Sequence, residues 1–243
     1  MNHIFNKTYT ITTNYLDLYD DLTPMGLLDL FQDAAGRHAY QLSAGYDDML
    51  ALGYYWVIVR NEVEIIKETP FGDDVAITTW PLVPTRFYFD RMYELKDEAG
   101  ETCVIARSRW LIIDEKHRRM QPSSVYHYPL ADFIDRQLFK EDFPSLIKVP
   151  LSEDIVLSYS VRQSDIDHNL HFNNARYAEL VYNALDIKSK NSIKRFFIYY
   201  HSECLLGDVI QLVKQAREDE VYIVGYKETQ LVFTSKVIWR SKQ

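Results

Sequence analysis

Two stretches of the chain repeat apolar residues at the spacing of an amphipathic helix. The first covers residues 24–42 and the second covers residues 173–186. Apolar residues at i, i+3, i+4 and i+7 share one face of a helix, and that face must be buried against another layer. Thr23 directly precedes Pro24, which is the favoured order of a capping residue and a first helical position. We therefore expect two long helices, each packed against a sheet.

Runs rich in β-branched and aromatic residues predict the strands of those sheets. In the first half they lie near residues 8–16, 55–67, 74–83, 87–96 and 102–114, and in the second half near 155–162, 194–203, 208–217, 220–228 and 230–240. A short helix is expected within residues 46–52. Residues 115–153 contain four prolines and no sustained periodicity, so they read as a long connection. The order of strand, helix and further strands thus occurs twice.

Two short segments support a repeat at the level of single residues. The segment around Asp20 precedes the first helix as the segment around Asp167 precedes the second. In that alignment Leu22 and Pro24 stand where the second copy has an asparagine and a histidine. A glutamate four residues before a Gly-Asp turn also occurs in both copies, at positions 68 and 203. We expect the first copy to keep the fold without the polar site, leaving its helix and sheet to hold an apolar ligand.

Composition restricts the classes of partner. The 243 residues carry 27 Lys and Arg against 35 Asp and Glu, a net charge of −8 that disfavours nucleic acid. Cys103 and Cys204 are too few for a disulfide framework or a zinc site, which favours a reducing cytoplasm. No leader-like apolar segment and no run of 18 apolar residues occurs, so we expect neither export nor a membrane partner. The sequence leaves open whether the protein forms a homodimer.

The loop before the second helix is unusually polar. Within ten residues it contains Asp165, Asp167, Asn169, His171, Asn173 and Asn174. Asp and Asn often cap helices, because their side-chain oxygens accept bonds from the free N–H groups at a helix start. One helix end cannot use six such side chains. We interpret Asp165 and Asn173 as caps and the others as candidates for a reactive site, with Asn174 as a further residue that helps to hold the loop.

An Asp-x-Asn-x-His-x-Asn-Asn loop that opens the second helix of a repeated helix-and-strand pattern resembles the double hotdog acyl-acyl carrier protein thioesterases. The resemblance covers nearly the whole chain. It implies an α+β protein of two tandem hotdog folds, each a long helix wrapped by a bent antiparallel sheet. The implied domains are a degenerate, acyl-binding N-terminal hotdog (1–121), a connection (122–152) and a C-terminal hotdog with the catalytic site (153–243).

The resemblance also implies an activity and its residues. A member of this family hydrolyses the thioester of a fatty acyl-acyl carrier protein to a free fatty acid and the carrier protein, a step of fatty acid biosynthesis that needs no metal or other cofactor. The carrier bearing its acyl chain is the implied partner. The family's functional residues fall on Asp167, Asn169, His171 and Glu203, and Cys204 occupies the position once proposed as a nucleophile in the plant enzymes.

Each of these residues has a chemical task that suits it. Glu203 could activate water if its carboxylate lies in a poorly hydrated site, and Asn169 could hold water or the carbonyl. His171 could polarise the carbonyl or relay a proton to the departing thiol, while Asp167 orients one of these groups. Glu203 and Cys204 are neighbours in an expected strand, so they should point to opposite faces. We favour water over Cys204, which suits a buried apolar role.

Other functions remain in competition. One is an acyl-coenzyme A hydrolase resembling the 4-hydroxybenzoyl-CoA thioesterase group, in which Asp167 would do the chemistry. Another is a non-catalytic acyl-binding module, and a third is a hotdog dehydratase, in which Asn169 and the Glu-Cys pair would have no task. The basic run at residues 116–119, with Lys194 and Arg195, could attract an acidic carrier, although short charge runs often only solvate a loop.

Overall fold

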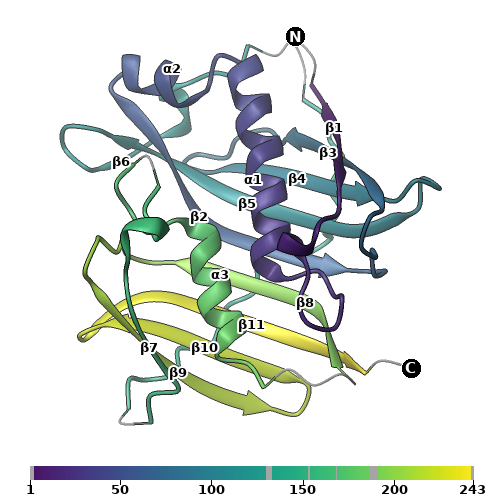
Figure 1. The fold of residues 1–243 in the computed structure, drawn as a ribbon. Helices are drawn as coiled ribbons and strands as arrows, with labels where there is room; N and C mark the ends of the chain where they lie inside the picture. The colour runs from purple at the N-terminus through teal and green to yellow at the C-terminus, as the bar shows by residue number, and fades with distance from the viewer. Residues whose placement is uncertain (1–2, 130–132, 153, 168, 187–190, 242–243) are drawn as a thin grey trace. The chain divides into compact units, whose positions relative to one another are not determined.

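The computed structural model describes residues 3–129, 133–152, 154–167, 169–186 and 191–241. The chain divides into two compact units, which are described separately (Figure 1). The first unit contains Met1–Thr12, Asp29–Asn61 and Ile66–Asp142, and the second contains Thr13–Leu28, Glu62–Ile65 and Phe143–Gln243.

The first half of the chain forms β1 (Phe5–Thr10), the 3-10 turn η1 (Thr13–Tyr15), α1 (Pro24–Gln41), α2 (Tyr46–Ala51), β2 (Tyr54–Ile65), β3 (Asp74–Pro81), β4 (Phe89–Lys96), β5 (Thr102–Asp114), β6 (Met120–Gln121) and η2 (Ser123–Val125). The second half forms β7 (Leu157–Ser160), η3 (Gln163–Asp165), α3 (Asn174–Asn183), β8 (Asn191–Tyr200), β9 (Val209–Arg217), β10 (Glu220–Lys227) and β11 (Gln230–Ser241).

The first unit is a helix laid on an antiparallel sheet. Its strands follow the order β1-β3-β4-β5-β2, and α1 lies along one face (Figure 1). The ring of Phe31 on α1 packs 5.0 Å from that of Tyr93 on β4, and both side chains are buried. The Thr23 hydroxyl accepts the Gly26 N–H at 3.0 Å, so the predicted cap of α1 is confirmed.

The second unit repeats this arrangement with the strand order β8-β11-β10-β9-β7 and the shorter helix α3 (Figure 1). Tyr177 on α3 places its ring 5.5 Å from Tyr200 of β8 and 5.5 Å from Phe233 of β11. Aromatic rings thus fill the space between helix and sheet, where each buried ring contributes a large apolar area. The expected α+β fold of two helix-on-sheet hotdog units is confirmed.

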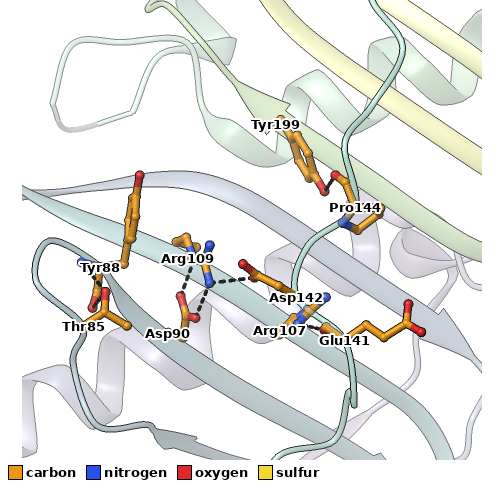
Figure 2. Close-up of polar contacts among 9 residues, drawn as sticks. All are labelled: Thr85, Tyr88, Asp90, Arg107, Arg109, Glu141, Asp142, Pro144 and Tyr199. Carbon is orange, nitrogen blue, oxygen red and sulfur yellow. Dashed lines mark hydrogen bonds and ion pairs between the residues drawn. The ribbon is translucent and has the colours of Figure 1, made fainter.

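The proline-rich connection is held by specific contacts. Phe139 joins Trp80 and Met92 in one buried cluster of the first unit. The Arg107 guanidinium donates to the Glu141 carbonyl oxygen at 2.7 Å, and Arg109 donates to the Asp142 carboxylate at 2.9 Å (Figure 2). Within this connection, residues up to 142 belong to the first unit and residues from 143 onward belong to the second. In the second unit the Tyr199 hydroxyl donates to the Pro144 carbonyl oxygen at 2.6 Å (Figure 2).

The loops that open α1 and α3 share one backbone frame, and this corrects the predicted alignment. Asp17 accepts the N–H groups of the residues two and four positions later, at 2.7 and 3.0 Å. Asp167 does the same at 2.8 and 3.2 Å. The residue three positions after each aspartate has a positive φ, 63° at Asp20 and 65° at Leu170. Pairing Asp20 with Asp167 is therefore wrong, because the counterpart of Asp167 is Asp17.

The corrected alignment changes which residues of the first loop stand in place of Asn169 and His171. Tyr19 and Asp21, rather than Leu22 and Pro24, stand where the second copy has asparagine and histidine. The sequence contains several aspartates in this segment, and the folded loop shows which of them accepts the backbone N–H groups of its own loop.

The second anchor of the repeat, the Gly-Asp turn, is confirmed. Gly72 and Gly207 adopt φ values of 88° and 86°, and their N–H groups donate to the carbonyl oxygens of Ile11 and Val161. A left-handed conformation of this kind favours glycine, which has no Cβ to clash. Within the part of the chain that the structure describes, no helix combines the length and the apolar character needed to cross a membrane.

Candidate active site

Asp165 is the first residue of the polar loop (residues 165–174) and holds its two ends together. This side chain is 4% exposed, and its carboxylate accepts the Tyr159 hydroxyl and the Arg162 N–H, both at 2.8 Å. Its carbonyl oxygen accepts the Asn173 N–H at 2.9 Å, which brings the two ends of the loop together. The predicted capping role of Asp165 is confirmed, although the group it caps is the 3-10 turn η3 rather than α3.

Asp167 shapes the middle of the loop. Its Oδ1 accepts the N–H groups of Asn169 and His171, and its own N–H donates to the His171 carbonyl oxygen at 2.9 Å. Leu170, between them, lies in the left-handed region, which is costly for a branched side chain and is kept only where surrounding bonds enforce it. Asp167 therefore fixes the directions in which the two neighbouring polar side chains leave the backbone.

The start of α3 is capped as predicted. The Asn173 side chain accepts the Ala175 N–H at 2.9 Å, satisfying one of the free donors of the first turn. Asn174 is the first helical residue, and its carbonyl oxygen accepts the Tyr200 hydroxyl at 3.0 Å. Both asparagines thus hold the junction between the loop, α3 and β8.

A second loop, after β8, brings in Glu203. The expected strand through residue 203 is wrong, because β8 ends at Tyr200 and a tight turn follows. The Phe172 N–H donates to the Cys204 carbonyl oxygen at 2.8 Å and joins this turn to the polar loop. Asp208 closes the turn by accepting the Leu205 N–H and the Lys227 ammonium. Burial would raise the pKa of Asp208, but these two donors hold it below its usual range.

His171 and Glu203 meet at the junction of the two loops. The distance from His171 Nε2 to Glu203 Oε2 is 3.2 Å. The His171 side chain is 19% exposed and the Glu203 side chain is 43% exposed. The Glu203 carboxylate is therefore hydrated in the free protein, so the condition of a poorly hydrated site is not met there.

Asn169 lies two residues before His171 and is half-buried. Its backbone N–H is used by Asp167, but among the described residues none bonds to its side-chain amide. An amide has two donors and an acceptor, so a half-buried one without a protein partner is suited to hold a ligand.

Cys204 faces the interior. Its side chain is 0% exposed, and the Tyr177 hydroxyl bonds to the sulfur. Burial raises the pKa of the Cys204 thiol, and the Tyr177 bond, which lowers it, does not offset that effect. A buried thiol with a raised pKa is a poor nucleophile. Tyr177 was predicted only as an apolar helix residue, although the need of a buried tyrosine hydroxyl for a partner was a usable signal.

The basic residues predicted to attract an acidic carrier differ in exposure and in their partners. The Arg195 guanidinium donates to the fully buried Glu62 carboxylate and also lies 3.8 Å from Glu64, so its charge is already paired within the second unit. Lys116 and Arg119 are exposed, and Arg118 donates to the Tyr55 hydroxyl at 2.9 Å. Across the described residues, no three His, Cys, Asp or Glu side chains gather in a way that could hold a metal ion.

Comparison with known families gives two matches that together cover most of the chain. The description "Acyl-ACP thioesterase N-terminal domain" matches residues 2–125, and "Acyl-ACP thioesterase C-terminal domain" matches residues 148–238. The second match contains the polar loop and the turn with Glu203.

Single proteins and solved structures give a consistent result. The chain is 28% identical over 229 residues to the chloroplastic oleoyl-acyl carrier protein thioesterase 1 of Arabidopsis thaliana, covering 84% of this chain and 58% of that protein. The chain thus spans a little over half the length of the curated relatives it matches. A crystal structure of an acyl-ACP thioesterase from Bacteroides thetaiotaomicron is 26% identical, with a TM-score of 0.89 and 98% of each chain covered. The 12:0-ACP thioesterase of Umbellularia californica, at 18% identity and a TM-score of 0.86, shares the fold over 100% of this chain and 99% of that one.

Proposed function

Because this chain belongs to the acyl-ACP thioesterase family, we propose that it hydrolyses the thioester of a fatty acyl-acyl carrier protein to a free fatty acid and the carrier protein. The observation that carries the proposal is the 3.2 Å pair of His171 and Glu203, together with the side-chain amide of Asn169 two residues before His171, which bonds to none of the described residues. A base, a proton carrier and an amide donor are the groups that hydrolysis of a thioester by water requires.

In the proposed reaction Glu203 takes a proton from water, and the water oxygen attacks the carbonyl carbon. The Asn169 amide donates a hydrogen bond to the oxygen that becomes negative. The C–S bond then breaks, and the proton passes from Glu203 through His171 to the departing thiolate sulfur. The 3.2 Å contact between the two side chains supports this transfer, because a proton moves readily between groups at hydrogen-bond distance.

Asp167 acts in this proposal as a positioning residue. Its Oδ1 already accepts two backbone N–H groups, and the same arrangement occurs at Asp17, where neither asparagine nor histidine follows. This disfavours the alternative in which Asp167 itself attacks or activates water in a coenzyme A hydrolase.

A turnover measurement tests the proposed function. Carrier-protein and coenzyme A thioesters of the same acyl chain, in a series of graded length, are incubated with the protein and the released acid is quantified. We expect a higher kcat/KM for the carrier thioesters. Equal or better turnover of the coenzyme A thioesters contradicts the proposed substrate, and release of no acid from either series favours a non-catalytic acyl-binding module.

We propose that the exposed turn between β5 and β6 attracts the acidic carrier. Changing Lys116, Arg118 and Arg119 together to Glu should raise KM for the carrier thioester and leave kcat unchanged, because a charged patch acts on association and is screened by salt. Steady-state kinetics at several ionic strengths measure this.

The matched variant with Gln at the same three positions removes half of the charge change and should give an intermediate KM. Both triple variants lose the Arg118–Tyr55 hydrogen bond, so a difference in KM between them reports the charge rather than the local structure. The docking proposal fails if both triple variants keep the parental KM and salt dependence.

We also propose that the acyl chain lies in the first unit, between α1 and its sheet. Ala35 on α1 is 5% exposed within this interior. Enlarging it, as in Ala35→Phe, should shift the preference toward shorter acyl chains, because the added ring occupies space that a long chain would need. The chain-length series above measures the shift, and an unchanged profile in a folded variant would locate the acyl chain elsewhere. A reducing cytoplasm remains our proposed setting, consistent with Cys103 and Cys204 being buried free thiols.

A further inference from the structure

Arg91 is a buried cation in the interior of the first unit. It lies on β4 with 5% of its surface exposed, and its Nη1 is 3.0 Å from Nδ1 of His38 on α1. The same nitrogen donates to the Thr79 hydroxyl at 3.3 Å, and the Tyr128 hydroxyl lies near the guanidinium. Among the described residues, no carboxylate pairs with Arg91.

The groups that contact Arg91 are electrically neutral. Arginine keeps its protons in proteins, so its N–H must donate and Nδ1 of His38 must accept with a lone pair. The Thr79 hydroxyl donates its own hydrogen to the Met92 carbonyl oxygen at 2.8 Å and likewise offers Arg91 a lone pair. A buried charge compensated by dipoles alone is costly, and one without an ionic partner calls for an explanation.

Arg109 on the neighbouring strand β5 is a buried arginine that is paired with carboxylates, as is usual. It is 9% exposed, and both ends of its guanidinium fork donate to the Asp90 carboxylate at 2.7 Å, with Asp142 as a second partner at 2.9 Å (Figure 2). Among the described residues, the first unit therefore matches the buried Arg109 with two carboxylates and leaves the buried Arg91 without one.

The surroundings of Arg91 combine aromatic side chains with a few polar atoms. Phe5 stacks on His38 at 5.9 Å, and Tyr93 packs on Phe31 while its hydroxyl lies 2.8 Å from the Ser108 hydroxyl. Tyr128 is only partly buried, so the polar cluster reaches toward solvent on that side. Aromatic side chains around a small number of convergent polar groups are the chemistry that lines many ligand sites.

We propose that Arg91, with His38 and Tyr128 beside it, is a binding site for a carboxylate carried on an apolar body. The ligand class is a fatty acid or an acyl chain with a second, terminal carboxylate. Its carboxylate supplies the anion that Arg91 lacks, and its hydrocarbon contacts the aromatic side chains nearby.

Direct binding tests the proposal without turnover. Decanoate and 1-decanol, which share one chain length, are titrated into the protein by isothermal titration calorimetry. We expect decanoate to bind more tightly, and Arg91→Met to weaken decanoate about 10–100-fold while decanol is unaffected, as expected for loss of a charge-assisted pair. Thermal stability of Arg91→Met should hold or rise, because a buried unpaired charge is replaced by an apolar chain.

Two further variants serve as controls. Arg107→Met removes a buried arginine of similar exposure from the neighbouring strand β5 and should leave the preference for decanoate intact. Arg91→Lys keeps the charge and should retain part of the preference, which also serves if Arg91→Met does not fold. Equal affinity of the parent for acid and alcohol overturns the proposal, as does a preference that survives Arg91→Met.

Two sources of the carboxylate can be distinguished by kinetics. If the site takes the released acid, added decanoate should inhibit turnover of the parent and not of Arg91→Met. If it takes the end of the acyl chain, a carrier thioester ending in a second carboxylate should have a lower KM than its methyl-ended analogue, and Arg91→Met should abolish this difference. The choice of source rests on the proposed function. Acid binding without any hydrolysis would contradict only that function, whereas hydrolysis without acid preference would contradict only this site.

Discussion

Replacing Glu203 with Gln is expected to lower kcat by about 10²–10⁴-fold, the usual worth of a positioned general base. The change keeps the size of the side chain and removes its ability to accept a proton from water. Because this side chain is 43% exposed, the free energy of unfolding should change by only about 0.5 kcal/mol or less. Single-turnover kinetics with a carrier thioester measure the loss.

The neighbouring residue gives a matched control. Cys204→Ala removes a fully buried sulfur and its contact with Tyr177, so it should lower thermal stability and leave most of kcat. Mass spectrometry of the reacting protein should reveal no acyl-enzyme. An inactive Cys204→Ala beside an active Glu203→Gln would reverse the assignment and make Cys204 the nucleophile.

Asn169→Ala should reduce kcat and kcat/KM together by about 10²–10³-fold, because its amide is expected to contact the carbonyl oxygen only when negative charge develops there. KM should stay near the parental value. Steady-state kinetics with one carrier thioester are sufficient to measure both constants.

Asn174→Ala provides the comparison for this variant. It removes another asparagine side chain from the same region, at the first position of α3. The bond from the Tyr200 hydroxyl to this residue is kept, because it uses the Asn174 carbonyl oxygen. It should keep a kcat close to that of the parent. Equal losses in the two variants would indicate that Asn169 only supports the loop.

Much of the fold was predictable because local signals agree with one another. The run of β-branched and aromatic residues located β5 at residues 102–114, and Thr23 and Asn173 were recognisable as caps by type and position. The grouping of Asn169, His171 and Glu203 came from the family resemblance, since nothing local indicates that residues 171 and 203 meet. Contacts between distant segments depend on the fold, and a single sequence does not encode them in any short pattern.

The errors have the same origin. Arg195 looked like an exposed cation, but its partner Glu62 lies more than a hundred residues earlier in the chain. Glu203 looked like a strand residue, because the aromatic run of β8 continues to the edge of the turn and hides where pairing stops. Arg91 gave no signal at all, since an arginine in a strand is ordinarily expected to face solvent.

The shared frame of the two helix-opening loops has a consequence for how this chain diversified. Between residues 13–23 and 163–173, the aspartate at positions 17 and 167 is the one residue identical at equivalent positions. The residues two and four positions later join that frame through backbone groups: both donate N–H groups to the aspartate, and the second also accepts the aspartate N–H with its carbonyl oxygen. After a duplication, mutations at those two positions could therefore exchange Tyr and Asp for Asn and His without disturbing the backbone. One ancestral loop could in this way give rise to an inert copy and a reactive copy.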